Sequence, residues 1–322
     1  MRFLKALRNR LRKRRLLASR KVSGIRGPRR LRATRGESPV FRFEAYRGMG
    51  VFESLSENWD RITDDVFKTG GRVLVKVNLN SSDPYPASTC PRAMAAFLDL
   101  LKFRGFTDLA VGDCSGIRDL PTRKVAKETG LLDAIEGKAE FFAFEEGRWF
   151  SVDIPGRYLK EVTLPEAVFE SNVIISFANI KSHALADFSL SMKLAVGFMH
   201  PAERFALHED HLQEKCVELS LAVMPDLVVI DGRTAMVTGG PFEGKTADLA
   251  VFLVGRDPLC VDLAAYRELE TARRSPADPG NFTRDPFGMR QFSHAVEIGL
   301  GQAVLPEIVH MGRHTMEEEK MP

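Results

Sequence analysis

Short apolar segments that each end in charged or amide side chains constrain the fold of this chain more than any other feature. Five such segments occur, at 72–79, 108–111, 173–177, 227–230 and 249–254. Apolar runs without polar alternation are typical of strands that are covered on both faces, as in parallel sheets. Helical spacing fills most of the intervals between them. We therefore predict an α/β fold, with a mostly parallel open sheet and helices on both faces.

The helices are expected where apolar residues recur every three or four positions. In the first of them, Phe52, Leu55, Trp59 and Ile62 fall on one face. The expected helical segments are 50–67, 89–105, 121–129, 131–135, 186–196, 207–224, 258–269 and 289–299. Residues 140–165 alternate instead, which predicts a small β insertion.

The charge of the chain is unevenly distributed. Residues 1–35 contain fifteen Lys and Arg and no acidic residue, which leaves 31 basic against 43 acidic residues in the remainder. Apolar residues at helical spacing within 3–17 predict a basic amphipathic helix, and Gly24–Arg35 has the composition of a linker. We assign 1–37 to a basic arm and 38–322 to the α/β domain. The arm either contacts an anionic surface, membrane or nucleic acid, or is a solvated tail.

Cysteine usage and hydropathy restrict the compartment and the cofactors. The four cysteines, Cys90, Cys114, Cys216 and Cys260, are far apart and form no CxxC pair. A zinc ribbon or a 4Fe-4S motif is therefore not encoded. No apolar run approaches the ~20 residues that span a bilayer, and the amino terminus has no secretory apolar region. We expect a cytoplasmic protein that contacts a membrane, if at all, from its periphery. The oligomeric state does not follow from the sequence.

Polar residues at the ends of the predicted strands define a candidate site. Lys76, Asn78, Asp113, Lys181 and Asp231 all fall there. Open α/β sheets bind ligands beyond the carboxyl ends of their strands. Buried lysines need a partner, so either they pair with Asp113, Asp231 and Asp262, or they form a pocket for a phosphate or carboxylate.

The segment Asn172–Leu212 concentrates further titratable groups, because it holds four of the seven histidines, Lys193 and Arg204. His183 is the acid/base candidate, since the ordinary pKa of histidine lies near neutral pH. His208 and His211 have the i,i+3 spacing that places two imidazoles on one helix face. With a third ligand they would hold a divalent metal; otherwise they are a surface or proton-relay pair.

Two glycine-containing loops follow strands. Gly239-Gly240-Pro241 could form a tight turn near a ligand, and 112–116 brings Cys114 and Ser115 to a strand end as nucleophiles or as turn residues. GxGxxG and GxSxG are both absent, so neither a dinucleotide site nor an α/β-hydrolase nucleophile is predicted.

Several segments resemble the DUF362 family when they are taken in order. The central one is Ile180-Lys181-Ser182-His183, with Lys193 ten residues after the histidine and a glycine soon after. The other matching segments are 75–79, 111–116, 229–232, 239–241 and 255–262, so the resemblance covers about 72–270. The resemblance implies the fold and the place of the site. It supports the site, because Lys76, Lys181 and Lys193 correspond to motif positions of the family. We predict His183, Lys181, Lys193 and Asp113 as catalytic residues, and Lys76, Asn78, Arg204, Asp231 and Gly240 as ligand-binding residues.

Two functions are consistent with this sequence. The first is binding of a small anionic ligand in a Lys/His/Asp site, as a metal-assisted enzyme or without metal. The second is a non-catalytic accessory role for a redox or iron-sulfur partner, which the resemblance implies because some family members carry a ferredoxin-like segment. Turnover would favour the first function, and a tight stoichiometric complex without turnover would favour the second.

Overall fold

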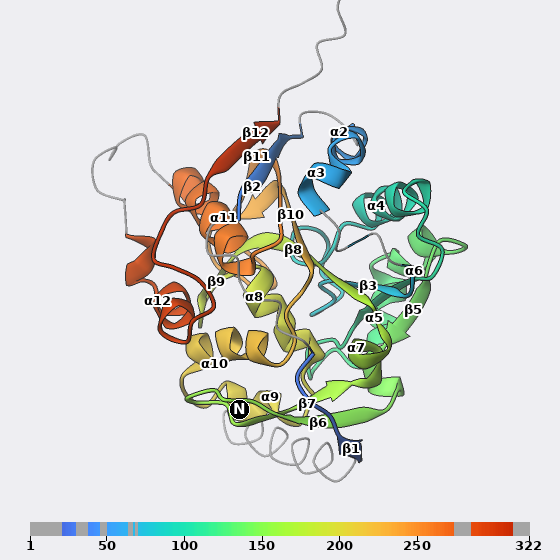
Figure 1. Cartoon of the computed structure of the whole chain (residues 1–322), viewed down its shortest axis with the longest axis vertical. Helices are drawn as coiled ribbons and strands as arrows, with labels where there is room; N and C mark the ends of the chain where they lie inside the picture. Colours follow the sequence, from blue (N-terminus) through green and yellow to red (C-terminus); the bar gives the residue numbers. More distant parts are fainter. Residues whose placement is uncertain are drawn as a thin grey trace, which may run out of the picture.

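A computed structural model describes residues 21–29, 38–45, 50–63, 67, 70–273 and 285–311. Within these ranges a nine-stranded sheet forms the centre of the molecule (Figure 1). Its strands in spatial order are β12 (Ile308–Met311), β2 (Val40–Glu44), β11 (Thr246–Gly255), β10 (Leu227–Met236), β8 (Val173–His183), β3 (Val73–Lys76), β4 (Leu109–Asp113) and β5 (Glu140–Ala143), with β9 (Asp187–Ser189) paired to β8.

Five neighbouring strands, β10, β8, β3, β4 and β5, run parallel, whereas β11 is antiparallel to both β10 and β2. The predicted α/β class and mostly parallel sheet are therefore confirmed. The strands β3, β4 and β8 are buried along their whole length, as expected for strands covered on both faces.

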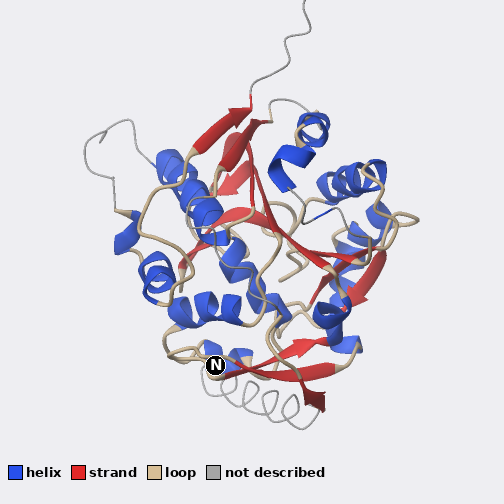
Figure 2. Ribbon diagram, viewed as in Figure 1, coloured by secondary structure: helices blue, strands red, loops and turns tan. Residues whose placement is uncertain are grey.

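Helices cover both faces of the sheet (Figure 2). The helices of each layer contribute to a separate cluster of buried apolar residues. The first layer contains α8 (Ser191–Leu194), α10 (Leu212–Glu218), α11 (Pro258–Arg273) and α12 (Arg290–Glu297), with the short helices α7 (Glu166–Glu170) and α9 (Arg204–Leu207). The second layer contains α2 (Val51–Glu57), α3 (Trp59–Thr63), α4 (Pro91–Phe103), α5 (Thr122–Glu128) and α6 (Leu131–Ile135). Single turns of 3-10 helix, η2 to η5, occupy Phe144–Glu146, Ala195–Phe198, Leu219–Leu221 and Pro286–Gly288.

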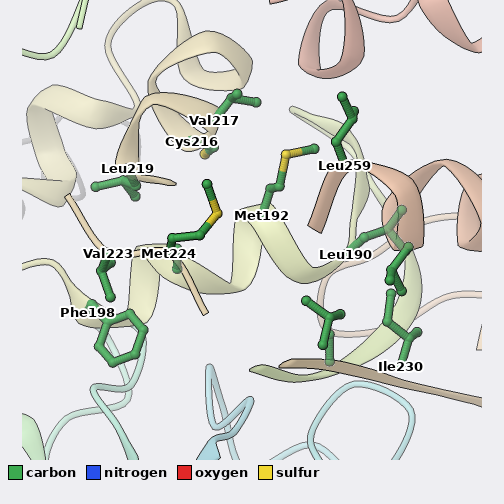
Figure 3. Packing of buried hydrophobic residues seen from close by; sticks show 14 of the residues in the cluster. Leu190, Met192, Phe198, Cys216, Val217, Leu219, Val223, Met224, Ile230 and Leu259 are labelled. Atoms are coloured by element: carbon green, nitrogen blue, oxygen red, sulfur yellow. The ribbon is translucent and has the colours of Figure 1, made fainter. Parts of the chain in front are cut away.

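Packing in the first layer fixes the short helix α8. Met192 is buried in the same cluster as Cys216 and Val217 of α10 and Leu259 of α11 (Figure 3). Full burial of such a side chain contributes about 1.5–3 kcal/mol. This apolar anchor holds α8 in place against α10 and α11.

A buried carboxylate caps the same helix. Asp262 of α11 is fully buried and accepts hydrogen bonds from the backbone N–H groups of Ser191 (2.8 Å) and Met192 (2.9 Å). These N–H groups have no partner inside the first turn of a helix. Asp262 thus caps α8 rather than pairing with a lysine, which was one of the two interpretations of the sequence.

A second, three-stranded sheet lies at one end of the molecule (Figure 1) and consists of β1 (Val22–Ile25), β6 (Trp149–Asp153) and β7 (Glu161–Pro165). The β insertion predicted at 140–165 is therefore divided, because β5 joins the large sheet.

The first residues of the predicted linker are also structured. They form β1, which pairs with β6, and Arg29 forms an ion pair of 2.6 Å with Asp226. This difference arises from long-range pairing, which the composition of a Gly/Pro/Arg segment does not reveal. The predicted helix within 3–17 lies outside the described residues.

Two further strands differ from the sequence prediction. The first part of the helix expected at 186–196 is β9, because Asp187 adopts a left-handed turn (φ 62°) that folds the chain back onto β8. The helix begins only at Ser191. Strand β2 was not predicted, and its place is set by pairing with β11 and β12. In the described part of the chain, no helix is long and apolar enough to cross a membrane.

Candidate functional site

A cavity of about 590 Å³ opens at the carboxyl ends of the parallel strands. Lys76 and Asp113 are the last residues of β3 and β4, and Lys181 and His183 end β8. Of the residues predicted for the site, those that line this cavity are Lys76, Asn78, Asp113, Lys181, His183, Lys193, Arg204, His208 and Gly240. The two that do not line it are His211 and Asp231.

Lys76 and Asp113 form a buried ion pair of 2.7 Å between Nζ and Oδ1. The carboxylate also accepts hydrogen bonds from the backbone N–H groups of Leu79 (2.6 Å) and Cys114 (2.7 Å). Burial lowers the pKa of Lys76, and the charge of Asp113 opposes that change. Asp113 therefore has partners for both oxygens and neutralises Lys76.

Glycine is required beside this ion pair. A Cβ atom on Gly197 would overlap Oδ1 of Asp113 and Nζ of Lys76. Gly197 is also the glycine that follows Lys193 in the motif. Its role is to let the backbone approach the pair closely.

Lys181 lies in the cavity wall with 3% of its surface exposed. Its Nζ donates a hydrogen bond to the carbonyl oxygen of Ala87 (2.7 Å), which also accepts one from Nδ2 of Asn78 (3.0 Å). Burial, followed by the charge of Lys193, lowers the pKa of Lys181 to about 7. The neutral amine is therefore far more accessible near neutral pH than it is for an ordinary lysine.

Lys193 extends from α8 into the same cavity. Among the described residues it has no hydrogen-bond or ion-pair partner at Nζ. Burial lowers its pKa, and the nearby Arg204 lowers it further. Of the three lysines that line the cavity, Lys193 is thus the one whose polar group has the fewest partners among the described residues.

His183 is held as a neutral imidazole. Its Nδ1 accepts hydrogen bonds from the backbone N–H groups of Leu185 (3.1 Å) and Ala186 (3.2 Å), so the ring proton is on Nε2. Burial, with the charges of Lys193 and Lys181, lowers the pKa of His183 to about 2. This geometry favours a hydrogen-bond donor in the cavity wall over the acid/base group that the sequence suggests.

Arg204 does not present free donors to a ligand. Its guanidinium is buried and makes five hydrogen bonds, all to backbone carbonyl oxygens. The acceptors include Cys114 and Ser115 of the loop after β4, and Gly197 and Met199 after α8. Arg204 therefore ties these two loops together and adds positive charge to the wall, instead of binding a ligand directly as predicted.

The expected pairing of His208 and His211 on one helix face is wrong. His208 is the C-cap residue that follows α9, whereas His211 adopts a left-handed conformation (φ 45°) and is the N-cap residue that precedes α10, so the helix is interrupted between them. His208 lines the cavity, while the ring of His211 stacks on Tyr158 at 4.1 Å between centroids. No group of three or more His, Cys, Asp or Glu residues in the described ranges is arranged to hold a metal ion.

Asp231 belongs to a separate polar cluster. It is fully buried, forms an ion pair with Arg233 (2.7 Å) and accepts a hydrogen bond from the hydroxyl of Tyr85 (2.9 Å). The predicted ligand-binding role is not supported by this placement, because Asp231 is already fully paired. The same loop supplies Tyr85 to this cluster and the Ala87 carbonyl to the cavity.

Gly240 acts through its backbone conformation. Gly240 has a positive φ of 78°, and a Cβ atom there would overlap the carbonyl oxygen of Ser182. Gly240 therefore allows the loop after β10 to close against β8.

Cys114 lies in the cavity wall, but burial raises the pKa of its thiol to about 12, which does not favour a nucleophilic thiolate.

The sequence prediction missed several cavity residues, including Asn80, Arg118, Asp119, Phe205 and Phe242. Arg118 lies over the ring of Phe242 at 5.3 Å and so joins the loop after β4 to the loop after β10. Both residues lie within two positions of a glycine or proline in the loops that the sequence marks as turns. Proximity to those turns is the signal that could have identified them.

Together, the fold and this cavity define an α/β protein with a cationic pocket at the carboxyl edge of a parallel sheet. The chain matches the family described as "Domain of unknown function (DUF362)" over residues 73–267, which is more than half of its length. It belongs to that family, and the resemblance drawn from the sequence is confirmed.

The chain is also similar to a curated protein. The chain is 25% identical over 205 residues to the thylakoid-associated protein sll1697 of Synechocystis sp., which covers 61% of this chain and 62% of the relative. Less than two thirds of that curated relative is therefore matched.

Two solved structures were also compared. The lactate racemase apoprotein of Thermoanaerobacterium thermosaccharolyticum gives a TM-score of 0.45 at 10% identity, covering 76% of this chain and 60% of that one. A Thermotoga maritima protein gives a TM-score of 0.41 at 15% identity, covering 69% of this chain and 58% of that one.

Proposed function

We propose that this protein binds a small anionic molecule, a phosphate or a carboxylate, in the cavity at the carboxyl edge of its sheet. The observation that carries the proposal is an excess of positive charge. Lys76 is neutralised by Asp113, but among the described residues neither Lys193 nor the protonated form of Lys181 has a carboxylate within ion-pair distance. Arg204 adds a further buried charge whose hydrogen bonds go only to neutral carbonyls.

Unpaired buried charge is unfavourable, which is why the surplus points to a ligand. An isolated ammonium loses several kcal/mol of hydration on burial and is normally compensated by a partner. The lowered pKa values of Lys181 and Lys193 express the same penalty. A bound anion would supply the missing negative charge, and the Nε2–H of His183 would donate to one of its oxygens.

A thermal-shift screen of the full chain tests the proposal. Phosphate and small mono- and dicarboxylates are titrated against the wild type, Lys193→Met and the control Lys127→Met, which removes an equal charge from the exposed face of α5. A ligand at 100 times its Kd stabilises the folded protein by about 2.7 kcal/mol, so the midpoint temperature of unfolding should rise by several degrees in the wild type and the control. Lys193→Met should lose most of that rise. Equal shifts in all three proteins would contradict the proposal.

We also propose that residues 1–35 attach the protein to the surface of an anionic membrane. The fifteen basic residues without an acidic one support it, as does the similarity to a thylakoid-associated protein. Each basic residue near an anionic membrane contributes about 1 kcal/mol.

Vesicle sedimentation tests this second proposal. A variant with serine at Arg12, Lys13, Arg14 and Arg15 should bind phosphatidylserine vesicles more than about a hundredfold more weakly. A control with serine at Lys124 and Lys127 should bind like the wild type. Binding that is unchanged in the first variant, or equal on zwitterionic vesicles, would contradict attachment through the arm.

A further inference from the structure

The surroundings of Lys181 differ from those of an ordinary buried ammonium. An ammonium group has three N–H donors, yet in the described part of the chain the Nζ of Lys181 has a single acceptor, the carbonyl oxygen of Ala87. That oxygen is shared with the amide of Asn78. One shared acceptor suits a neutral amine, which can donate one hydrogen bond and keep its lone pair for the cavity.

Lys76, the neighbouring lysine on β3, shows the contrast. Its Nζ contacts Asp113 at 2.7 Å and donates to the carbonyl oxygen of Val77 at 2.7 Å. Burial lowers the pKa of Lys76, but a carboxylate at that distance favours the ammonium form and occupies its Nζ. Of the two buried lysines that end strands in this cavity, Lys181 is therefore the one with an available lone pair.

We propose that Lys181 is a nucleophilic amine that forms an imine with an aldehyde or ketone carrying a phosphate or carboxylate group. The proposal rests on the proposed anion binding, because Lys193 holds the anionic group while the carbonyl carbon meets Lys181. Both lysines line one cavity of about 590 Å³, which is large enough for a phosphorylated or carboxylated metabolite. Leu185, which is 66% exposed, also lines this cavity, so the space reaches the surface.

The reaction needs no oxidant, reductant or metal. The lone pair of Nζ attacks the carbonyl carbon and gives a carbinolamine. The C–O bond then breaks, the nitrogen forms a double bond to carbon, and the oxygen leaves as water with the two protons lost by the amine. The Nε2–H of neutral His183, which lines the same cavity, is suited to donate a hydrogen bond to the carbonyl oxygen during the attack.

The charges around Lys181 also favour a neutral amine at physiological pH. Lys193 from α8 and Lys76 from β3 disfavour the ammonium form, while Asp113 from β4 and Asp83 from the loop after β3 favour it. Burial is the largest influence; it acts with the two lysines against the two carboxylates and brings the pKa to about 7, where amine nucleophiles are effective.

Reductive trapping of the full chain tests the inference. Pyridoxal 5′-phosphate, and pyridoxal as the same aldehyde without the phosphate, are each incubated with the protein and sodium cyanoborohydride at pH 7. Peptide mass spectrometry then locates the secondary amines. We expect the phosphorylated aldehyde to label Lys181 about tenfold faster than pyridoxal does, and inorganic phosphate to slow the labelling.

Two variants sharpen the test. Lys181→Arg keeps a positive charge without a nucleophilic amine, so cavity labelling should disappear. Lys193→Met should slow labelling by the phosphorylated aldehyde about tenfold and leave the pyridoxal rate unchanged. Lys127 serves as the internal reference for an exposed amine in every sample. The wild-type map decides the question even if a variant does not fold.

The outcomes separate this inference from the proposed function. Labelling restricted to Lys127 and other exposed lysines, in a protein that phosphate stabilises, would overturn the imine and leave anion binding intact. Labelling of Lys181 at equal rates by both aldehydes, with no effect of phosphate, would overturn the anionic substrate class and contradict the proposed function.

Discussion

Two polar clusters lie on either side of the loop that follows β3, and they differ in whether their charges balance. In one, Asp231 is paired with Arg233 and hydrogen-bonded to Tyr85. In the other, Lys181 and Lys193 face a cavity in which no carboxylate of the described residues lies within ion-pair distance of either. The first is complete without a ligand, whereas the second is incomplete. Surplus charge beside an open cavity, rather than charge at a strand end, is what marks a binding site here.

The balanced cluster should be the more sensitive to loss of a partner. Arg233→Met leaves the fully buried carboxylate of Asp231 without its cation, so we expect the free energy of unfolding to fall by about 3–5 kcal/mol. Urea denaturation measures it. The control Arg123→Met breaks an exposed pair with Glu146 and should cost at most about 1 kcal/mol. Similar losses in both would show that the Asp231 cluster is not a buried structural pair.

Within the cavity, the Lys76–Asp113 pair should behave like the balanced cluster. Asp113→Asn removes the charge that neutralises Lys76 and leaves only one strong acceptor for two backbone N–H groups. We expect a loss of about 3 kcal/mol in urea denaturation. Lys193→Met, which removes an unpaired charge, should change stability by less than about 1 kcal/mol without ligand. A larger loss of stability from Lys193→Met than from Asp113→Asn would contradict the assignment of Lys76 as the paired lysine and Lys193 as the unpaired one.

The close approach of the backbone to that pair gives a third prediction. Gly197→Ala would place a methyl group against Asp113 and Lys76, so we expect a loss of about 2 kcal/mol and weaker anion binding. Gly147→Ala is the matched control, because its nearest neighbour, the carbonyl oxygen of Phe144, is 3.8 Å from the added Cβ. A neutral effect of Gly197→Ala would mean that the loop can move away from the pair.

The most gradual expected effect is a dependence of stability on pH. The folded-state pKa of Lys181 is lowered to about 7 from 10.5, so the unfolded chain binds the extra proton between these values. Stability from this group therefore rises with pH from about 7 to 10.5, by at most about 1.4 kcal/mol per pH unit. The difference in unfolding free energy between wild type and Lys181→Met isolates it. A difference that is constant from pH 7 to 10 would contradict the lowered pKa.

How much could be predicted differed between the fold and the site. The apolar segments at 72–79, 108–111 and 173–177 became β3, β4 and β8, because a strand buried on both faces needs a continuous apolar run. Strand β1 and strand β9 were missed, since each owes its conformation to a partner far away or to a single turn residue. Local composition carries no record of such pairing.

For the site, strand-end position identified Lys76, Lys181 and Asp113 correctly as cavity residues but not Asp231. One local signal was available: residues i and i+2 of a strand share a face, so Arg233 was placed to pair with Asp231. The interruption of the helix between His208 and His211 could not be predicted from the sequence, because their i,i+3 spacing is compatible with one continuous helix or with two. Spacing predicts which side chains can meet only when the element itself is continuous.

The most direct test of the central claim is where an anion sits. Crystals of the wild type soaked in selenate, a tetrahedral dianion with anomalous scattering, would reveal the position from an anomalous difference map. The account predicts a peak in the cavity within hydrogen-bond distance of Lys193 or Lys181, and no peak beside Arg233. Peaks confined to the protein surface, with the cavity empty at concentrations that occupy those surface sites, would contradict it.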